Sequence, residues 1–285
     1  MSTAHWPNDP VFVAVSGTPA DTPAVHLAAA EAILRRRPLH LLAVYEPPSE
    51  RNDRVAVTTA LAGARLAMTD ALLWLRASHP DLEVDCRVLP GDPAVLLVTR
   101  SGTAAEVVVP VSTPVRGVPT VGERVAAYAR CPVLVSHAGG EPGGDVVVAL
   151  DGIAPAEPLL GYGFEAAALR GVVLRPMLVW NALPDSAFGT LNPFAFDRAA
   201  ADVEADRLLA EELAGWSEKY PDVVVHRRAL HATDVATALE HFSADAALVV
   251  VGARSRDARG VTALGGVTRR LIRTARCPVV VVRLG

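Results

Sequence analysis

The stretch VVVALDG at residues 146–152 decides the fold, because VFVAVSG at residues 11–17 matches it near the start of the chain. Two further pairs are AAEVVVP at 104–110 with AALVVVG at 246–252, and RCPV at 130–133 with RCPV at 276–279. The three pairs lie 135, 142 and 146 residues apart, so the offset grows in chain order. Offsets that grow in this way are expected of a duplicated domain with two insertions in its second copy.

Each half alternates short apolar runs with alanine- and leucine-rich stretches of helical length. Such continuous apolar runs are typical of parallel strands that helices cover on both faces. The expected strands are residues 11–15, 39–45, 84–89, 106–109 and 133–136, then 146–150, 172–180, 223–230, 247–251 and 279–282. The sequence therefore predicts an α/β fold of two tandem, doubly wound domains, each with a five-stranded parallel sheet. They span residues 1–137 and 145–285, on either side of a Gly/Pro-rich linker.

The composition is that of a globular protein with a large apolar core. Of 285 residues, 51% are hydrophobic and 20% are charged, and the net charge is −4. A general nucleic-acid-binding protein needs a basic surface, so this class is not expected. No apolar run reaches the roughly 18 residues of a membrane span, and the N-terminus does not resemble a secretory signal, so we expect a cytoplasmic protein without a membrane partner. Cys86, Cys131 and Cys277 form no CxxC or Cys/His cluster, so no metal site is expected.

The residues that follow the first and fourth strands of the second half are the candidates for a binding site. In open α/β sheets, ligands bind beyond the carboxyl ends of the strands, where the strand order reverses. Asp151 closes the first strand, and a polar, glycine-bearing loop at residues 252–265 follows the fourth. This loop opens a helix expected over residues 266–274, whose free first-turn amides and dipole favour an anion. The glycines at its start allow close approach of the backbone, and Thr268 offers a hydroxyl.

At these residues the chain resembles a two-domain universal stress protein, and the resemblance covers both halves. Nucleotide-binding members of that family carry the motif G-x2-G-x9-G-[ST] after strand four and an aspartate after strand one. The second half matches at Gly252, Gly265 and Asp151, and departs from the motif at Ser255 and Gly266. The resemblance implies an adenine nucleotide α-hydrolase-like fold with a nucleotide site in this half. By position, Ala149, Leu150, Asp151 and the backbone of Val179 would surround adenine and ribose, and Gly252, Ser255, Gly265, Gly266, Val267 and Thr268 would line the phosphates.

The first half has lost the residues that the motif needs. Pro110 replaces the leading glycine and has no amide hydrogen to donate. The loop that follows is four residues shorter than its counterpart, and Pro119-Thr120 stand where the second half has its paired glycines. Ser16 stands where the second half has Asp151. We therefore expect no ATP site in the first half.

The leading functional expectation is a universal stress protein that binds ATP or a related adenine nucleotide in its second half, with or without Mg²⁺. The resemblance implies a regulatory role in which occupancy of the site alters shape or partner affinity. The alternative is a nucleotide-free interaction scaffold, which the departures at Ser255 and Gly266 keep open. Slow ATP hydrolysis is the most that an enzymatic interpretation supports, because Lys219 is the only lysine and no obvious general base is present.

The resemblance also implies how the halves assemble. They are expected to pack about a pseudo-twofold axis, as an intramolecular pseudo-dimer, and a homodimer of whole chains stays open. The segment at residues 181–196 carries Phe188, Leu191, Phe194 and Phe196. It is interpreted as a lid over the nucleotide, a partner surface, or a loop whose aromatic side chains pack back onto the protein.

Overall fold

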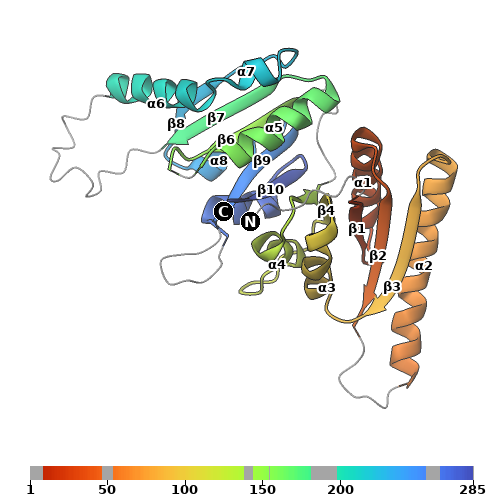
Figure 1. Ribbon diagram of the computed structural model, residues 1–285. Coiled ribbons are helices and arrows are strands. Elements are labelled where there is room, and N and C mark those ends of the chain that lie inside the picture. Colours follow the sequence, from red (N-terminus) through yellow and green to blue (C-terminus); the bar gives the residue numbers. More distant parts are fainter. Residues whose placement is uncertain are drawn as a thin grey trace.

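The computed structural model describes residues 9–46, 54–137, 144–153, 155–180, 198–254 and 264–284. Within these ranges ten strands form a single sheet with the order β3-β2-β1-β4-β5-β10-β9-β6-β7-β8 (Figure 1). The strands are β1 Val11–Val15, β2 Leu39–Tyr45, β3 Val84–Pro90, β4 Glu106–Pro110, β5 Val133–Ser136, β6 Asp145–Leu150, β7 Leu174–Trp180, β8 Arg228–His231, β9 Ala246–Arg254 and β10 Val279–Leu284.

The sheet consists of two five-stranded sets that meet at their fifth strands. Both sets place their strands in the order third, second, first, fourth, fifth. Neighbouring strands within a set are parallel. β5 and β10 pair antiparallel instead, with Val135 opposite Val279. The predicted α/β architecture of two parallel, doubly wound sets is confirmed, and the antiparallel junction makes their strands run in opposite directions.

Helices cover both faces of the sheet, which explains the continuous apolar strands. The helices are α1 Asp21–Arg35, α2 Arg54–Ser78, α3 Pro93–Arg100, α4 Val121–Tyr128, α5 Glu157–Arg170, α6 Arg198–Glu212, α7 Trp216–Lys219, α8 Val235–Phe242 and α9 Gly266–Thr274, with a 3-10 turn at Ser101–Thr103. α1, α2, α5 and α6 contribute to one apolar core, and α3, α4, α8 and α9 contribute to a second core on the other face. Successive strand residues alternate between the two, as Val146 and Val147 do.

Two segments differ most from the sequence-based prediction. The strand expected at residues 223–230 begins only at Arg228. Before that point the chain makes a single bridge from Val225 to Leu174, and Val223 donates its amide to Tyr220 in a turn, so no regular ladder forms. β9 is longer than expected and continues to Arg254. Most of the linker, at residues 138–143, and the aromatic segment at 181–196 lie outside the described residues.

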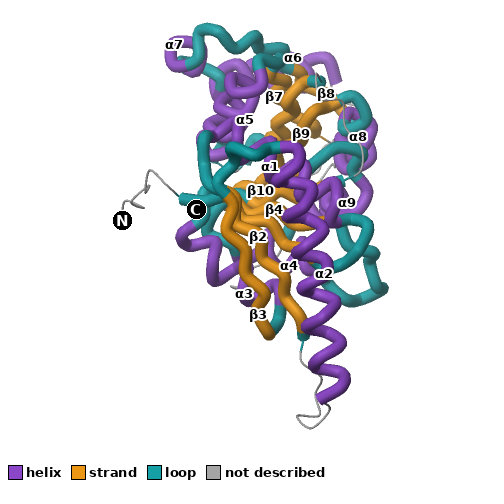
Figure 2. Tube along the Cα trace, turned by 90° about the vertical axis from the view of Figure 1, so that its right-hand side faces the viewer, coloured by secondary structure: helices purple, strands orange, loops and turns teal. Residues whose placement is uncertain are grey.

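α2 lies along the outer side of the first half (Figure 2). It has 25 residues, of which Met68 and Leu75 are buried. An 18-residue window within it has a mean hydropathy of 1.2, so by length and composition α2 meets the test for a membrane span. Every such window includes Arg65 and Asp70, and the longest stretch of α2 without a charge is residues 55–64, so the expectation that no uninterrupted apolar run reaches about 18 residues is not contradicted.

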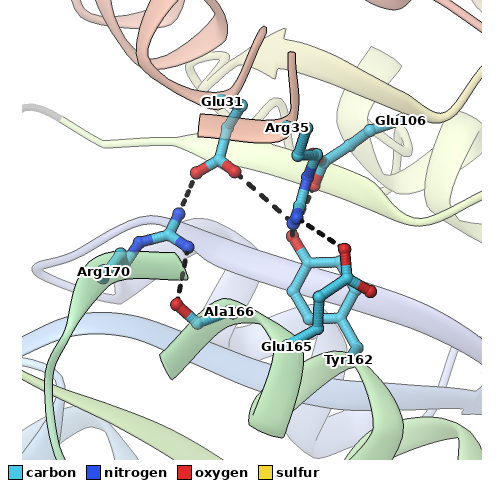
Figure 3. Close-up of polar contacts among 7 residues, drawn as sticks. All are labelled: Glu31, Arg35, Glu106, Tyr162, Glu165, Ala166 and Arg170. Carbon is cyan, nitrogen blue, oxygen red and sulfur yellow. Dashed lines mark hydrogen bonds and ion pairs between the residues drawn. The ribbon is translucent and has the colours of Figure 1, made fainter. Parts of the chain in front are cut away.

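A cluster of charged side chains and one tyrosine joins the two halves on the α1 and α5 side of the sheet, and we call it the interface charge cluster. It comprises Glu31, Arg35 and Glu106 from the first half and Tyr162, Glu165 and Arg170 from the second (Figure 3). Arg35 Nε lies 3.2 Å from Glu106 Oε2, and the Tyr162 hydroxyl donates to Glu106 Oε1 at 2.6 Å. Arg170 pairs with Glu31. Glu31 and Glu106 are fully buried, so each depends on these partners.

The other face of the junction is held by α4 and α9. Glu123 of α4 accepts two hydrogen bonds from the Arg273 guanidinium, each at 3.0 Å. His137, just after β5, places Nε2 3.1 Å from the carbonyl oxygen of Ile272. Contacts on both faces of the sheet therefore hold the halves together.

Candidate functional site

The carboxyl ends of β6 and β9 form the topological switch point of the second half. β6 pairs with β7 on one side and with β9 on the other. Val148 is opposite Val250, so Leu150 and Gly252 lie two residues further toward the same edge. α5 leaves this edge on one face of the sheet and α9 on the other. The strand ends that the sequence analysis selected therefore lie at the switch point, where ligands bind in such sheets.

Asp151 begins the turn that leaves β6. Its side chain is exposed, and its Oδ1 accepts a hydrogen bond from the amide of Ile153 at 3.0 Å. Gly152 has a φ of +67°, a conformation that glycine adopts without strain. The aspartate is thus held in an open turn at the switch point, with its carboxylate accessible from solvent.

The residues expected around adenine lie on two faces of the sheet. Ala149 and Val179 belong to the apolar core beneath α8 and α9, which also contains Val267. Leu150 belongs to the opposite core, beneath α5. The side chains of Leu150 and Val179 are buried, with exposed fractions of 7% and 6%, so a ligand at this edge meets mainly their backbone atoms.

Gly252 has a packing role in the fold. A Cβ atom at this position would lie 2.6 Å from Cδ1 of Leu284, the last residue of β10. A side chain here would force the Leu284 side chain to shift, so packing against β10 gives glycine a structural reason to be present, whether or not a phosphate approaches it. The Gly252 carbonyl oxygen accepts a hydrogen bond from Thr268 Oγ1 at 2.9 Å.

Thr268 fastens the first turn of α9 to the end of β9. It is buried, with an exposed fraction of 5%, and its hydroxyl hydrogen is directed to Gly252. The sequence assigned this hydroxyl to a phosphate, whereas in the structure it positions the helix that would carry the anion. The oxygen of the hydroxyl is an acceptor only, so toward a phosphate the residue can offer its amide.

The start of α9 has the features of an open helix N-terminus. Gly265 is the N-cap residue, with φ −57° and ψ 154°, and it makes no side-chain cap. Cβ atoms added at Gly265 and Gly266 would meet nothing within 4 Å of them. The amides of Gly266, Val267 and Thr268 occupy the first turn, where a helix has no partners of its own for its N–H groups. Among the described residues, this end of the helix is open to an anion.

Part of the predicted phosphate loop lies outside the described residues. Ser255 and the rest of residues 255–263 belong to this part, and so do the arginines at positions 256 and 259. The described site thus consists of the two strand ends, the turn at Asp151 and the start of α9.

The corresponding turn of the first half is closed by its own side chain. Asp21 accepts hydrogen bonds from the Ser16 amide at 2.9 and 3.0 Å, from the Gly17 amide at 2.6 Å and from the Ser16 hydroxyl at 2.7 Å. It is buried, with an exposed fraction of 9%. The residue at the matching position of the second half is Ala156, which has no carboxylate to place in the turn.

The helix that follows β4 is also closed. Thr120 caps α4, and its Oγ1 accepts from the Glu123 amide at 3.2 Å while Glu123 Oε2 accepts from the Thr120 amide at 2.7 Å. This reciprocal capping box satisfies the amides of Thr120 and Glu123 with side chains of the same helix end, whereas the N-cap of α9 is a glycine without such a side chain. The sequence predicted the first half to be inactive from Pro110 and Ser16, but it did not identify Asp21 or the capping box. The T-x-x-E pattern at residues 120–123 was the available signal for the box.

A cavity of about 620 Å³ lies beside the closed turn, between α1 and α2. Its lining includes Ser16, Asp21, Tyr45, Ala64 and Trp74, and none of the described lining residues comes from β4 or α4. It therefore lies to one side of the switch point of the first half. The ring of Trp74 stacks on His26 at a centroid distance of 3.8 Å and closes one wall.

Comparison with known proteins identifies the same family in both halves. The model of the universal stress protein family matches residues 7–137 and again residues 144–283. A universal stress protein of Mycolicibacterium smegmatis is 31% identical over 294 residues, covering 96% of each chain. The universal stress protein Rv2623 of Mycobacterium tuberculosis is 29% identical over 292 residues, again covering 96% of each.

Solved structures agree in architecture. A universal stress protein from Archaeoglobus fulgidus DSM 4304 superimposes with a TM-score of 0.68 at 15% sequence identity, covering 98% of each chain. At this identity the likeness concerns the fold.

Proposed function

Because the chain belongs to the universal stress protein family, we propose that its second half binds ATP or a related adenine nucleotide and that occupancy of this site regulates a stress response. In this proposal residues 145–285 form the nucleotide-binding domain, and residues 1–137 form a domain that does not bind nucleotide. The protein acts in the cytoplasm as a regulator. Chemical turnover, if any, is limited to slow hydrolysis.

The contrast between the two helix N-termini carries the proposal. The N-cap of α9, Gly265, provides no side-chain cap, whereas at the start of α4 the side chains of Thr120 and Glu123 accept hydrogen bonds from two of the helix-end amides. The turns after β1 and β6 differ in the same sense, because Asp21 fills the first and Ala156 stands in its place in the second. In the first half, carboxylates of the chain itself occupy these positions, whereas in the second half no such carboxylate does. This difference supports the binding of an external anion in the second half.

The proposed arrangement assigns each group by its chemistry. The first-turn amides of α9 would hold the phosphates, with the helix dipole adding favourable charge. The exposed carboxylate of Asp151 would accept from a ribose hydroxyl. The backbone at Ala149 and Val179 would border the base, since the Val179 side chain is buried. A bound Mg²⁺ would need oxygen ligands, and Asp151 is the carboxylate of the site that could contribute one.

A nucleotide-free scaffold is the second candidate, and two observations favour it. A Cβ at Gly252 would press on the Leu284 side chain, and the Thr268 hydroxyl donates to the Gly252 carbonyl. Both residues therefore have structural reasons to be present without a ligand.

Calorimetric titration of the whole chain with ATP, AMP and cAMP tests the first proposal. We expect saturable binding of one nucleotide per chain, weakened at least about tenfold by Gly265→Asp, because the new carboxylate lies where the phosphates would. The substitution has room in the fold, and an aspartate at an N-cap stabilises a helix, so the variant should unfold no earlier than the wild type.

The matched control is Pro119→Asp, which places the same charge at the corresponding exposed position of the first half. This variant should bind as the wild type does. The absence of heat with all three nucleotides would favour the scaffold, and equal losses in both variants would contradict a site in the second half. Prolonged incubation with labelled ATP measures any hydrolysis.

A further inference from the structure

The outward face of α2 carries an apolar seam with coiled-coil spacing. Its large members are strongly exposed: the exposed fraction is 77% for Val55, 63% for Leu66 and 65% for Leu73. Thr59, Ala62 and Thr69 lie between them and are exposed as well. The seam at positions 55, 59, 62, 66, 69 and 73 alternates steps of four and three residues. That alternation keeps one stripe of a helix against a partner helix.

The polar groups near this seam are turned inward. Thr58 Oγ1 donates to the Arg54 carbonyl oxygen at 2.7 Å, and Thr69 Oγ1 donates to that of Arg65 at 2.9 Å. Since the hydroxyl hydrogens are bonded within the helix, these side chains present mainly their methyl groups outward.

The seam is not a general property of the repeated fold. α6 follows the second strand of the second half, as α2 follows that of the first. Its 15 residues include seven charged ones, whereas the 25 residues of α2 include four. On α6, Arg207 pairs with both Glu204 and Glu211 across the exposed face. The apolar face is thus specific to α2.

The charges beside the seam indicate what covers it. Arg65 directly precedes Leu66, and Asp70 directly follows Thr69, so they flank the seam on opposite sides, five residues apart. In a parallel, in-register pair of helices these are the g and e positions, which face each other across the interface. Arg65 would then face Asp70 of the partner subunit, twice by symmetry, whereas an antiparallel pair would bring Arg65 close to Arg65 of the partner subunit.

We propose that the outward face of α2 is a dimerisation surface, on which α2 of a second copy of this chain packs in parallel. From Val55 to Leu73 the seam is about 27 Å long at the rise of an α-helix. A contact of this length lies at the small end of specific interfaces, so the dimer forms and dissociates with concentration. It does not involve the second half, and its existence is independent of nucleotide binding.

Sedimentation analysis of the whole chain over a range of concentrations tests the proposal. The wild type should show a reversible monomer–dimer equilibrium. Leu66→Gln should raise the dissociation constant about tenfold or more, because it places two amides in the centre of the seam. Arg65→Asp and Asp70→Arg should each raise it about fivefold, since each brings like charges together.

The double variant Arg65→Asp with Asp70→Arg is the decisive control. It restores opposite charges at both contacts, so its dissociation constant should return to within about threefold of the wild-type value. All these side chains are exposed, and circular dichroism checks that the fold is kept. A chain that is monomeric at every concentration would overturn the proposal, as would a double variant no better than either single one.

A membrane surface is the competing occupant, because α2 is apolar enough to enter a bilayer by composition. Co-sedimentation with phosphatidylglycerol vesicles distinguishes the two. Vesicle binding that Leu66→Gln abolishes, by a chain that stays monomeric in solution, would assign the seam to lipid and overturn the dimer.

Discussion

Arg35 is the residue on which the interface charge cluster depends most. Its guanidinium contacts Glu106 at 3.2 Å, Glu165 at 3.0 Å and the Tyr162 hydroxyl at 3.0 Å. At about pH 8, where Glu106 is ionised, Arg35→Met would leave the buried carboxylates of Glu31 and Glu106 short of a cation, which costs about 3–5 kcal/mol. We expect a large drop in the urea midpoint of unfolding. Arg207→Met, which removes an exposed guanidinium from α6, should change the urea midpoint far less, because solvent screens its ion pairs. Equal effects of the two variants would contradict this account.

At the scale of single residues, the sequence predicted positions better than roles. Asp151, Gly252 and Gly265 lie at the predicted switch point because strand order follows from the repeat and the right-handed crossovers. The role of Gly252 against Leu284 could not be predicted, since it depends on the side-chain packing of β10. The closure of the first turn by Asp21 was missed for a similar reason, because it depends on how the chain curls between residues 16 and 21.

The two glycines of α5 test how tightly a helix packs on the sheet. A Cβ atom at Gly163 would lie 2.3 Å from Cγ2 of Val148, a stiff and fully buried side chain. Gly163→Ala should therefore destabilise the protein by about 1–3 kcal/mol through overpacking. A Cβ at Gly161 meets only Trp216, at an ordinary 3.5 Å, so Gly161→Ala should be neutral or gain up to about 1 kcal/mol of helix propensity. Thermal unfolding of both variants measures the difference, and a Gly163→Ala variant as stable as Gly161→Ala would refute the close packing.

The pattern of apolar residues predicted the central strands of the sheet correctly but did not predict the limits of the edge strand β8. β1, β6, β4 and β9 are buried on both faces, and each contains a continuous apolar stretch that predicts a strand. β8 pairs only with β7 and has partly exposed residues, so its limits depend on local hydrogen bonds that apolar content does not encode. α9 begins and ends where its glycines and its apolar period predicted, at Gly266 and Thr274.

The junction between the halves gives the whole molecule a dependence on pH. Burial, and then the neighbouring Glu31 carboxylate, raise the pKa of Glu106 from an ordinary 4.5 to about 7. The folded protein therefore holds a proton that the unfolded chain releases at lower pH, so this group's stabilisation is present below about pH 4.5 and is lost as the pH rises through about 7. Melting temperatures at about pH 5.5 and about pH 8 should differ more in the wild type than in Glu106→Gln, which stays neutral.

Glu165→Gln is the matched control for this pH effect, because it removes an exposed carboxylate from the same cluster. It should retain the wild-type difference between the two pH values. If Glu106→Gln keeps the full difference as well, the titrating group lies elsewhere.

The antiparallel seam of β5 and β10 has one more consequence. Because the two sets of strands point opposite ways, the open end of α9 and the hollow between α1 and α2 belong to opposite borders of the molecule. A large protein bound at one edge of the sheet would leave the opposite edge uncovered, so two binding partners need not exclude each other sterically. Occupancy of one site can then affect the opposite edge only through a displacement of the strands that is transmitted across the β5–β10 junction.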